Sequence, residues 1–130
     1  MKLLLDTHIW LWSRKDPKLI GKKRVWAELE NDANELWLSP ISTWEALILH
    51  RKGKIVLHAD PIHWVEQMVR GFREAPLTHE IVVTAEGLQL SHADPADRFL
   101  AATAKVLALT LVTADRRLLG LGDIATLANR

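Results

Sequence analysis

The segment DPADRFLAATAKVLALTLVTAD, residues 94–115, predicts a helix followed by a strand and then an acid. A proline follows Asp94, and proline suits the first turn of a helix because the N–H that it lacks would be unpaired there anyway. The small and apolar residues that come next predict a helix to about Leu107, and residues 109–113 are rich in strand-forming types. The segment therefore predicts a helix, a strand and, in Asp115, a carboxylate at the strand's carboxyl end.

The start of the chain also shows a strand that ends in an acid. A short apolar run at residues 3–5 is followed by Asp6, and residues 7–13 carry apolar side chains toward a helix. Residues 36–38 predict a second strand, and residues 39–51 predict a helix opened by Ser-Pro. Asp16-Pro17 is expected to open another helix, whose buried face carries Leu19, Ile20, Val25, Trp26 and Leu29. The remaining expected elements are a helix from Asp60-Pro61 to about Phe72, an extended piece at residues 75–77, a helix from Thr78 to Leu88, and an edge strand at residues 124–127.

These elements predict a single α/β domain over residues 1–130. Strands that alternate with helices cannot be joined as hairpins, so they should lie parallel with right-handed crossovers between them. We expect a central parallel sheet of about four to five short strands with helices on both faces. With 48% hydrophobic residues the chain can bury one core, and no repeat or low-complexity tract marks a second domain.

Composition limits the possible chemistry and location. The chain has no Cys, so any metal must be held by oxygen or imidazole ligands, which favours Mg²⁺ or Mn²⁺. The net charge of +1 excludes a global positive field, so any contact with nucleic acid must be local. Asp6 cuts the first apolar run far short of a signal peptide or a membrane span, so we expect a cytoplasmic protein without membrane contact.

Four acids stand at strand ends, at a helix start or in apolar surroundings: Asp6, Glu45, Asp97 and Asp115. Asp6 and Asp115 should share an edge of the sheet, because sites of parallel sheets form at the carboxyl ends of the strands. Each acid also has a structural explanation, since Asp is a preferred helix cap and Asp97 suits a first turn. If all four converged they would repel one another, and a divalent cation would resolve that conflict.

Several other residues have two interpretations. Asp94 either caps the helix that Pro95 starts or adds a further acid to the pocket. The six His residues show no metal-ligand spacing, so we do not expect ligation by His. The basic run from Lys15 to Arg24 is interpreted as a solvated helix face. Arg98, Arg116 and Arg117 lie beside two of the acids and are better placed for phosphates, although such residues also complement helix C-termini.

Four segments in this order carry a resemblance to a known family: LLLDTHIWLW (3–12), LSPISTWEALIL (38–49), HADPADRFLAATA (92–104) and LVTADRRLL (111–119). They resemble the PIN-domain nucleases, in particular the VapC-like toxins of bacterial toxin-antitoxin operons. Each segment contains one of the four acids, and together the segments span nearly the whole chain.

The resemblance implies a Mg²⁺- or Mn²⁺-dependent ribonuclease that forms a homodimer and is inhibited by a cognate antitoxin protein. Carried over by motif, Asp6 and Asp97 are the main metal ligands. Glu45 and Asp115 complete the acidic pocket, binding the metal directly or through water. The remaining expected site residues are Thr7 and Thr113, which would orient carboxylates by hydrogen bonds, Asp94 as the uncertain acid, and Arg98 and Arg116 as substrate contacts.

Two other functions compete with a ribonuclease. A PIN-like RNA-binding or scaffold module with a silent site is the first, and the presence of all four acids argues against it. Another acidic-cluster phosphohydrolase is the second. An aspartyl phosphatase would want a second Asp two residues after the first, where this chain has His8, and a DNA flap nuclease would need guiding elements for which the short chain has little room.

Overall fold

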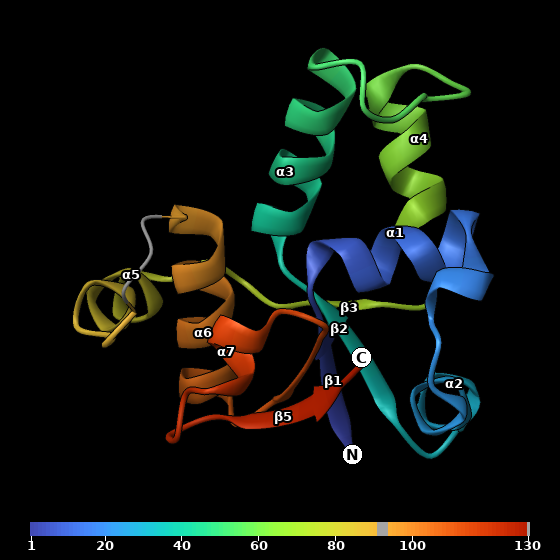
Figure 1. Cartoon of the computed structure of the whole chain (residues 1–130). Helices are drawn as coiled ribbons and strands as arrows, with labels where there is room; N and C mark the ends of the chain where they lie inside the picture. Colours follow the sequence, from blue (N-terminus) through green and yellow to red (C-terminus); the bar gives the residue numbers. More distant parts are fainter. Residues whose placement is uncertain (91–93, 130) are drawn as a thin grey trace.

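The computed structural model describes residues 1–90 and 94–129 and contains a five-stranded sheet in which every strand pair is parallel. The strand order is β3-β2-β1-β4-β5 (Figure 1). The strands are β1 (Lys2–Leu5), β2 (Glu35–Leu38), β3 (Arg73–Glu74), β4 (Thr110–Thr113) and β5 (Ala125–Ala128). The expected parallel sheet of four to five short strands is confirmed, and the strand expected at residues 124–127 is the edge strand β5.

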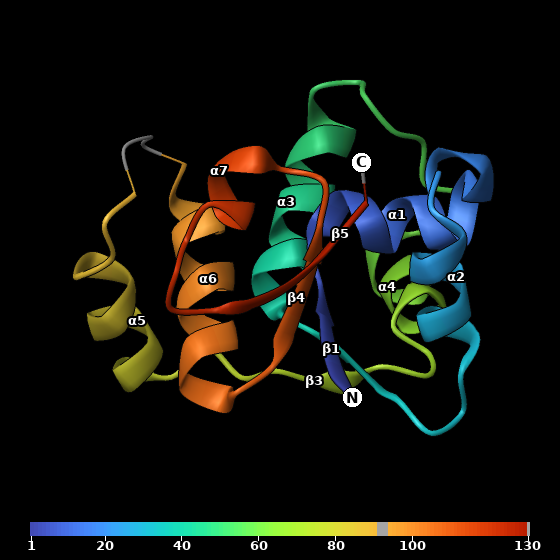
Figure 2. The same cartoon turned by 60° about the horizontal axis from the view of Figure 1, so that its bottom comes forward.

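Helices cover both faces of this sheet, as predicted. They are α1 (Thr7–Lys15), α2 (Lys23–Glu30), α3 (Pro40–Arg51), α4 (Pro61–Met68), α5 (His79–Glu86), α6 (Pro95–Leu107) and the short α7 (Arg116–Leu119). Figures 1 and 2 show α5, α6 and α7 on one side of the sheet and α1 and α2 on the other. Helix α3 packs against both α1 and α6, which brings the two layers together beyond the strand ends.

The central strand β1 separates two hydrophobic cores. Leu3 and Leu5 belong to the core with α1, α2 and α4, whereas Leu4 belongs to the core with α5, α6 and α7, and all three side chains are fully buried. In the neighbouring strand β4, Leu111 and Val112 divide between the two cores in the same way. This alternation follows from the two-residue period of a strand and explains why β1 is an uninterrupted apolar run.

The carboxyl ends of β1 and β4 lie next to each other. Leu5 pairs with Val112 in the sheet, and the Asp6 N–H donates to the Val112 carbonyl at 3.0 Å. Asp6 follows β1 and Asp115 comes two residues after β4, so both lie at one edge of the sheet, as expected.

The single helix expected after Asp16-Pro17 is wrong. Residues 17–19 form one 3-10 turn, the chain is irregular at residues 20–22, and α2 begins only at Lys23. Gly21 lies in the break, and glycine inside a helix costs about 1 kcal/mol relative to alanine. Ile20 is nevertheless buried, which shows that apolar spacing alone did not require a continuous helix.

The expected boundaries in the middle of the chain are also partly wrong. Helix α4 ends at Met68 rather than near Phe72, because the chain turns at Gly71, whose φ of +83° favours glycine. Strand β3 therefore occupies Arg73–Glu74 instead of residues 75–77. The other expected helices and strands are present within a few residues of their predicted ends.

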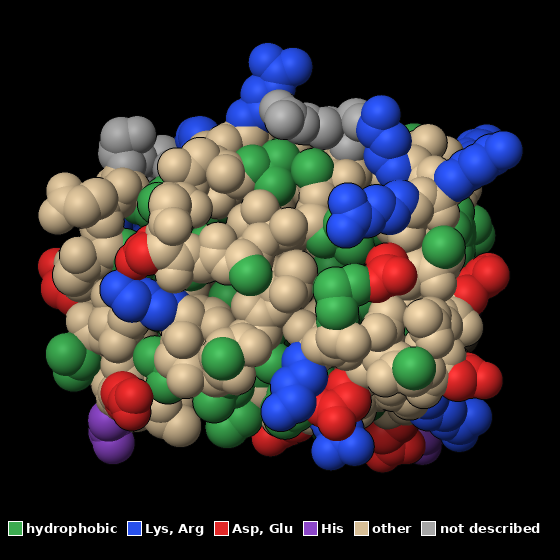
Figure 3. All heavy atoms as spheres, turned by 90° about the horizontal axis from the view of Figure 1, so that it is seen from below, with side chains coloured by type: hydrophobic (Ala, Val, Ile, Leu, Met, Phe, Trp, Pro, Cys, Tyr) green, Lys and Arg blue, Asp and Glu red, His purple; other side chains and the backbone are tan. Residues whose placement is uncertain are grey.

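Two surface properties bear on function. In the part of the chain that the structure describes, no helix combines the length and the apolar character needed to cross a membrane. Figure 3 shows Lys and Arg side chains at several separate places on the face seen from below, with Asp and Glu among them rather than in one basic patch. This dispersal agrees with the net charge of +1.

Candidate functional site

An acidic pocket of about 350 Å³ lies where β1 and β4 end and α1, α3, α6 and α7 approach one another. It is lined by Asp6, Thr7, His8, Ile9, Trp12, Glu45, Asp94, Asp97, Leu100, Ala114, Asp115 and Arg117. All four acids selected from the sequence therefore line one pocket, although they come from four separate segments. Asp94 is a fifth acid in the lining, and His8 and Trp12 close the pocket on the side of α1.

Asp6 is the most buried of these acids, with 9% of its surface exposed. One carboxylate oxygen accepts the Ile9 N–H at 2.9 Å, so Asp6 caps α1, and the other accepts the hydroxyl of Thr113. Burial raises the pKa of Asp6, the two hydrogen bonds and the nearby His8 lower it, and the charge of Asp115 raises it further. A buried carboxylate that faces another acid is costly to ionise, and a cation would lower that cost.

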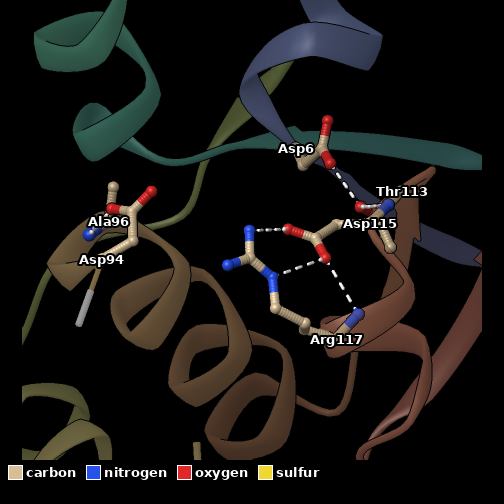
Figure 4. Close-up of polar contacts among 6 residues, drawn as sticks. All are labelled: Asp6, Asp94, Ala96, Thr113, Asp115 and Arg117. Atoms are coloured by element: carbon tan, nitrogen blue, oxygen red, sulfur yellow. Dashed lines mark hydrogen bonds and ion pairs between the residues drawn. The ribbon is translucent and has the colours of Figure 1, made fainter. Parts of the chain in front are cut away.

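The Thr113 hydroxyl connects the two acids at the sheet edge. It donates to Asp6 and accepts the backbone N–H of Asp115 at 3.0 Å, and its side chain is fully buried at the end of β4 (Figure 4). Thr113 therefore holds the carboxylate of Asp6 and the backbone of Asp115 in a fixed relation. This position agrees with the orienting role expected from the sequence.

Thr7 does the same for the acid on α3. Its hydroxyl donates to the Glu45 carboxylate and lies 3.0 Å from the hydroxyl oxygen of Ser42. Thr7 and Ser42 are both buried. Ser42 was not predicted from the sequence as a site residue. Its position three residues before Glu45, on the same side of a largely apolar helix, could have indicated that it lies beside Glu45.

The electrostatic couplings divide the acids of the pocket into two groups. Asp6 and Asp115 form the group at the sheet edge, and the charge of Asp115 raises the pKa of Asp6. Burial raises the pKa of Glu45, and after the opposing hydrogen bond from Thr7 the charges of Asp94 and Asp97 raise it further. These mutual effects show that the pocket concentrates negative charge from α3, α6 and two strand ends.

Asp94 combines the two roles that the sequence left open, a helix cap and an acid of the pocket. Its carboxylate accepts the Ala96 N–H at 3.0 Å and caps α6, and the same side chain lines the acidic pocket. Asp97, in the first turn of α6, is half-buried in the pocket lining. Capping and membership of the pocket are therefore compatible for Asp94.

The three arginines near the acids differ in their contacts. The Arg98 guanidinium donates to the carbonyls of Ala85, in the last turn of α5, and of Leu88 and Leu90, beyond its end, at 2.9–3.2 Å, and Arg98 is not in the lining of the acidic pocket. Arg116 is exposed and is also absent from the described lining. Arg117 does line the pocket, where it contacts Asp115. The substrate contacts of Arg98 and Arg116 remain predictions, and that of Arg98 would require it to leave its carbonyl partners.

The donor set of the pocket fits a hard divalent cation. Each oxygen of Asp6 accepts one of these two hydrogen bonds and keeps a second lone pair for an ion. As the side chains are placed in residues 1–90 and 94–129, no three acids or histidines are grouped closely enough to chelate one ion. Mg²⁺ needs only one or two protein carboxylates, because it keeps several of its waters.

Comparisons with known proteins agree with this geometry. Residues 3–123 match the PIN domain family. The chain is 32% identical over 117 residues to ribonuclease VapC22 of Mycobacterium tuberculosis, which covers 89% of this chain and 88% of that protein.

Solved structures share the fold at lower identity. A chain of VapBC2 from Rickettsia felis, bound to a promoter DNA fragment, superposes with a TM-score of 0.73 at 14% identity, covering 98% of both chains. A chain of VapBC-1 from nontypeable Haemophilus influenzae gives a TM-score of 0.70 at 19% identity, again over 98% of both chains.

Proposed function

Since the chain belongs to the PIN domain family, we propose that it is a Mg²⁺- or Mn²⁺-dependent endoribonuclease and the toxin of a toxin-antitoxin pair. The observation that carries the proposal is the convergence of Asp6, Glu45, Asp97 and Asp115 from distant segments in one pocket. The similarity to a ribonuclease at 32% identity over most of the chain supports RNA as the substrate.

In this proposal Asp6 and Asp97 hold the cation, and Glu45 and Asp115 bind it directly or orient its waters. Thr113 and Thr7 fix the carboxylates of Asp6 and Glu45 through the hydrogen bonds described above. When bound, the divalent cation supplies an activated water and neutralises charge on the scissile phosphate. The chain itself contributes the orientation of the acids, the burial that keeps Asp6 out of bulk water, and a cap of α6 by Asp94 at the pocket rim.

The partners are also part of the proposal. Several of the structurally similar proteins are VapBC toxin-antitoxin complexes, which supports a cognate antitoxin as the inhibitor of this chain. The homodimer and the cytoplasmic location stay predictions from the sequence. A silent RNA-binding module remains the competing function, and the presence of four ordered acids in the pocket argues against it.

The test is cleavage of a labelled RNA pool by the purified wild type, Asp6→Asn and a matched control, Asp32→Asn. Asp32 is an exposed acid outside the pocket, so its variant makes the same chemical change without touching the site. Each protein is assayed with Mg²⁺, with Mn²⁺ and with EDTA. We expect cleavage by the wild type and Asp32→Asn with either metal, and none with EDTA or with Asp6→Asn.

Two results would count against the proposal. Cleavage that persists in EDTA would reject metal dependence, and cleavage by a folded Asp6→Asn protein equal to that of Asp32→Asn would reject the site. If the folded wild type binds RNA without cutting any of the pool, the binding-module function is favoured instead.

A further inference from the structure

Arg117 lies in the acidic pocket without a role in the proposed site, and its contacts suggest one. We propose that Asp115 holds Arg117 at the pocket, and that Arg117 releases Asp115 when the divalent cation binds to Asp115. The released guanidinium then binds a phosphate of the RNA and positions it. The inference rests on the proposed function, since it needs a cation and an RNA at this site.

The ion pair between Arg117 and Asp115 uses both oxygens of the carboxylate. The backbone N–H and the Nε of Arg117 donate to Oδ1 at 2.8 and 3.3 Å, and Nη2 donates to Oδ2 at 3.2 Å. A carboxylate offers about four lone-pair sites in total. The donors of Arg117 occupy three of these sites, so a cation that ligates Asp115, directly or through a water, binds the oxygens that hold the guanidinium and weakens their contact by repulsion between the two positive charges.

The guanidinium also lies near the acids of α6. Figure 4 shows it on the side of Asp115 that faces Asp94 at the start of α6. The hydrogen bond and charge of Asp115, together with the charges of Asp97 and Asp94, raise the pKa of Arg117. Arg117 is thus a positive charge close to the acids that would bind the cation.

The Asp115–Arg117 pair is exposed enough to exchange readily. The side chain of Arg117 is 56% exposed and that of Asp115 is 25% exposed, and ion pairs in such surroundings contribute little net stability. The two guanidinium contacts can break while the backbone N–H of Arg117 keeps its bond to Oδ1 and preserves the cap of α7. The arginine stem then remains anchored to α7 beside the pocket.

A released guanidinium matches a phosphate in charge and shape. Its planar fork can donate two parallel hydrogen bonds to phosphate oxygens. Arg98 is less suited to binding a phosphate, because its guanidinium already donates to three carbonyls at the C-terminal end of α5. Arg116 is exposed and outside the pocket lining. Of these three arginines, Arg117 is therefore the one that can bind first Asp115 and then a phosphate of the RNA.

The first test measures Mn²⁺ affinity by calorimetric titration of the full-length wild type, Arg117→Gln and Arg116→Gln without RNA. The two variants remove the same charge one residue apart, so they share the change in net charge, whereas only Arg117→Gln removes a charge from the pocket. We expect Arg117→Gln to bind Mn²⁺ about two- to fivefold more tightly than Arg116→Gln, because it alone removes a competitor for Asp115. Equal affinities in the two variants would overturn the inference.

The second test measures RNA cleavage at saturating Mn²⁺. Arg117→Gln should lower kcat/KM about tenfold or more relative to the wild type, since a charged hydrogen-bond donor to phosphate is lost. Arg117→Lys should recover part of the loss, because it restores the charge without the planar fork. Unchanged cleavage by Arg117→Gln would reject the phosphate contact, whereas a wild type that neither binds Mn²⁺ nor cuts RNA would reject the proposed function itself.

Discussion

At the scale of single residues, the site depends on hydroxyl groups as much as on acids. Thr113 and Thr7 are buried, and each donates to an acid that comes from another part of the chain. A buried carboxylate remains ionised only when such donors and nearby positive charge offset the loss of hydration. The two threonines therefore tune the acids as well as orienting them.

Replacing Thr113 by Val should disturb Asp6 without changing the shape of the core. The Thr113 hydrogen bond lowers the pKa of Asp6, so its loss moves that pKa further above the usual value. More Asp6 is then protonated at low pH, and the acidic limb of the pH–rate profile should move to higher pH. We expect kcat/KM at neutral pH to fall about tenfold, as is typical when a group that supports a metal ligand is lost.

Thr103→Val is the matched control for that experiment. Thr103 is also fully buried, and its hydroxyl donates to the Phe99 carbonyl within α6 at 2.6 Å. Its replacement should leave the pH–rate profile in place. A Thr113→Val profile that coincides with the Thr103→Val profile would show that the hydroxyl does not tune Asp6.

At the scale of elements, three acids of the pocket are also helix caps. Asp6 caps α1, Asp94 caps α6 and Asp115 caps α7, so these three helices begin at the pocket. Acids are favoured at helix N-termini because free N–H groups and the helix dipole stabilise negative charge. The fold can therefore concentrate acids here, since each capping interaction offsets part of the unfavourable free energy of their mutual repulsion.

The cap of α6 can be separated from the charge of Asp94. Asp94→Asn keeps an oxygen that can accept the Ala96 N–H, so its free energy of unfolding should stay close to that of the wild type. Asp94→Ala removes the cap and should lower the free energy of unfolding by about 1 kcal/mol. Urea denaturation of the three proteins measures the difference. Equal stability of the Ala and Asn variants would show that the Asp94 hydrogen bond does not stabilise α6.

At the scale of the whole molecule, positive and negative charges nearly cancel. The net charge is +1, and the face in Figure 3 carries Lys and Arg among Asp and Glu. A protein without a global positive field is not expected to hold a long RNA through many cation–phosphate contacts. Recognition should instead depend on a few contacts beside the acidic pocket.

The salt dependence of cleavage tests this expectation. With about three phosphate contacts to a single strand, kcat/KM should fall only about ten- to twentyfold between 50 and 200 mM KCl at saturating metal. Cleavage of one labelled RNA over that range gives the slope. A loss of about a thousandfold would indicate six or more contacts and would contradict a local binding site.

Features that depend on neighbours along the chain could be predicted from the amino-acid sequence. Strands that alternate with helices must be parallel, and their carboxyl ends share an edge, so the joint position of Asp6 and Asp115 followed from local patterns. The helix caps and most element ends were predictable for the same reason. The break at Gly21 and the turn at Gly71 were not, because apolar spacing continues across both.

The side chains that complete the pocket could not be predicted in this way, because they meet through the packing of distant segments. Ser42 meets Thr7 across 35 positions of the chain, and Thr113 meets Asp6 across 107. Arg98 donates to carbonyls at the C-terminal end of α5, whereas Arg117 lines the pocket, although both residues are close to an acid in the sequence. Long side chains choose their partners from whatever the packed helices bring within reach, and no local pattern records that choice.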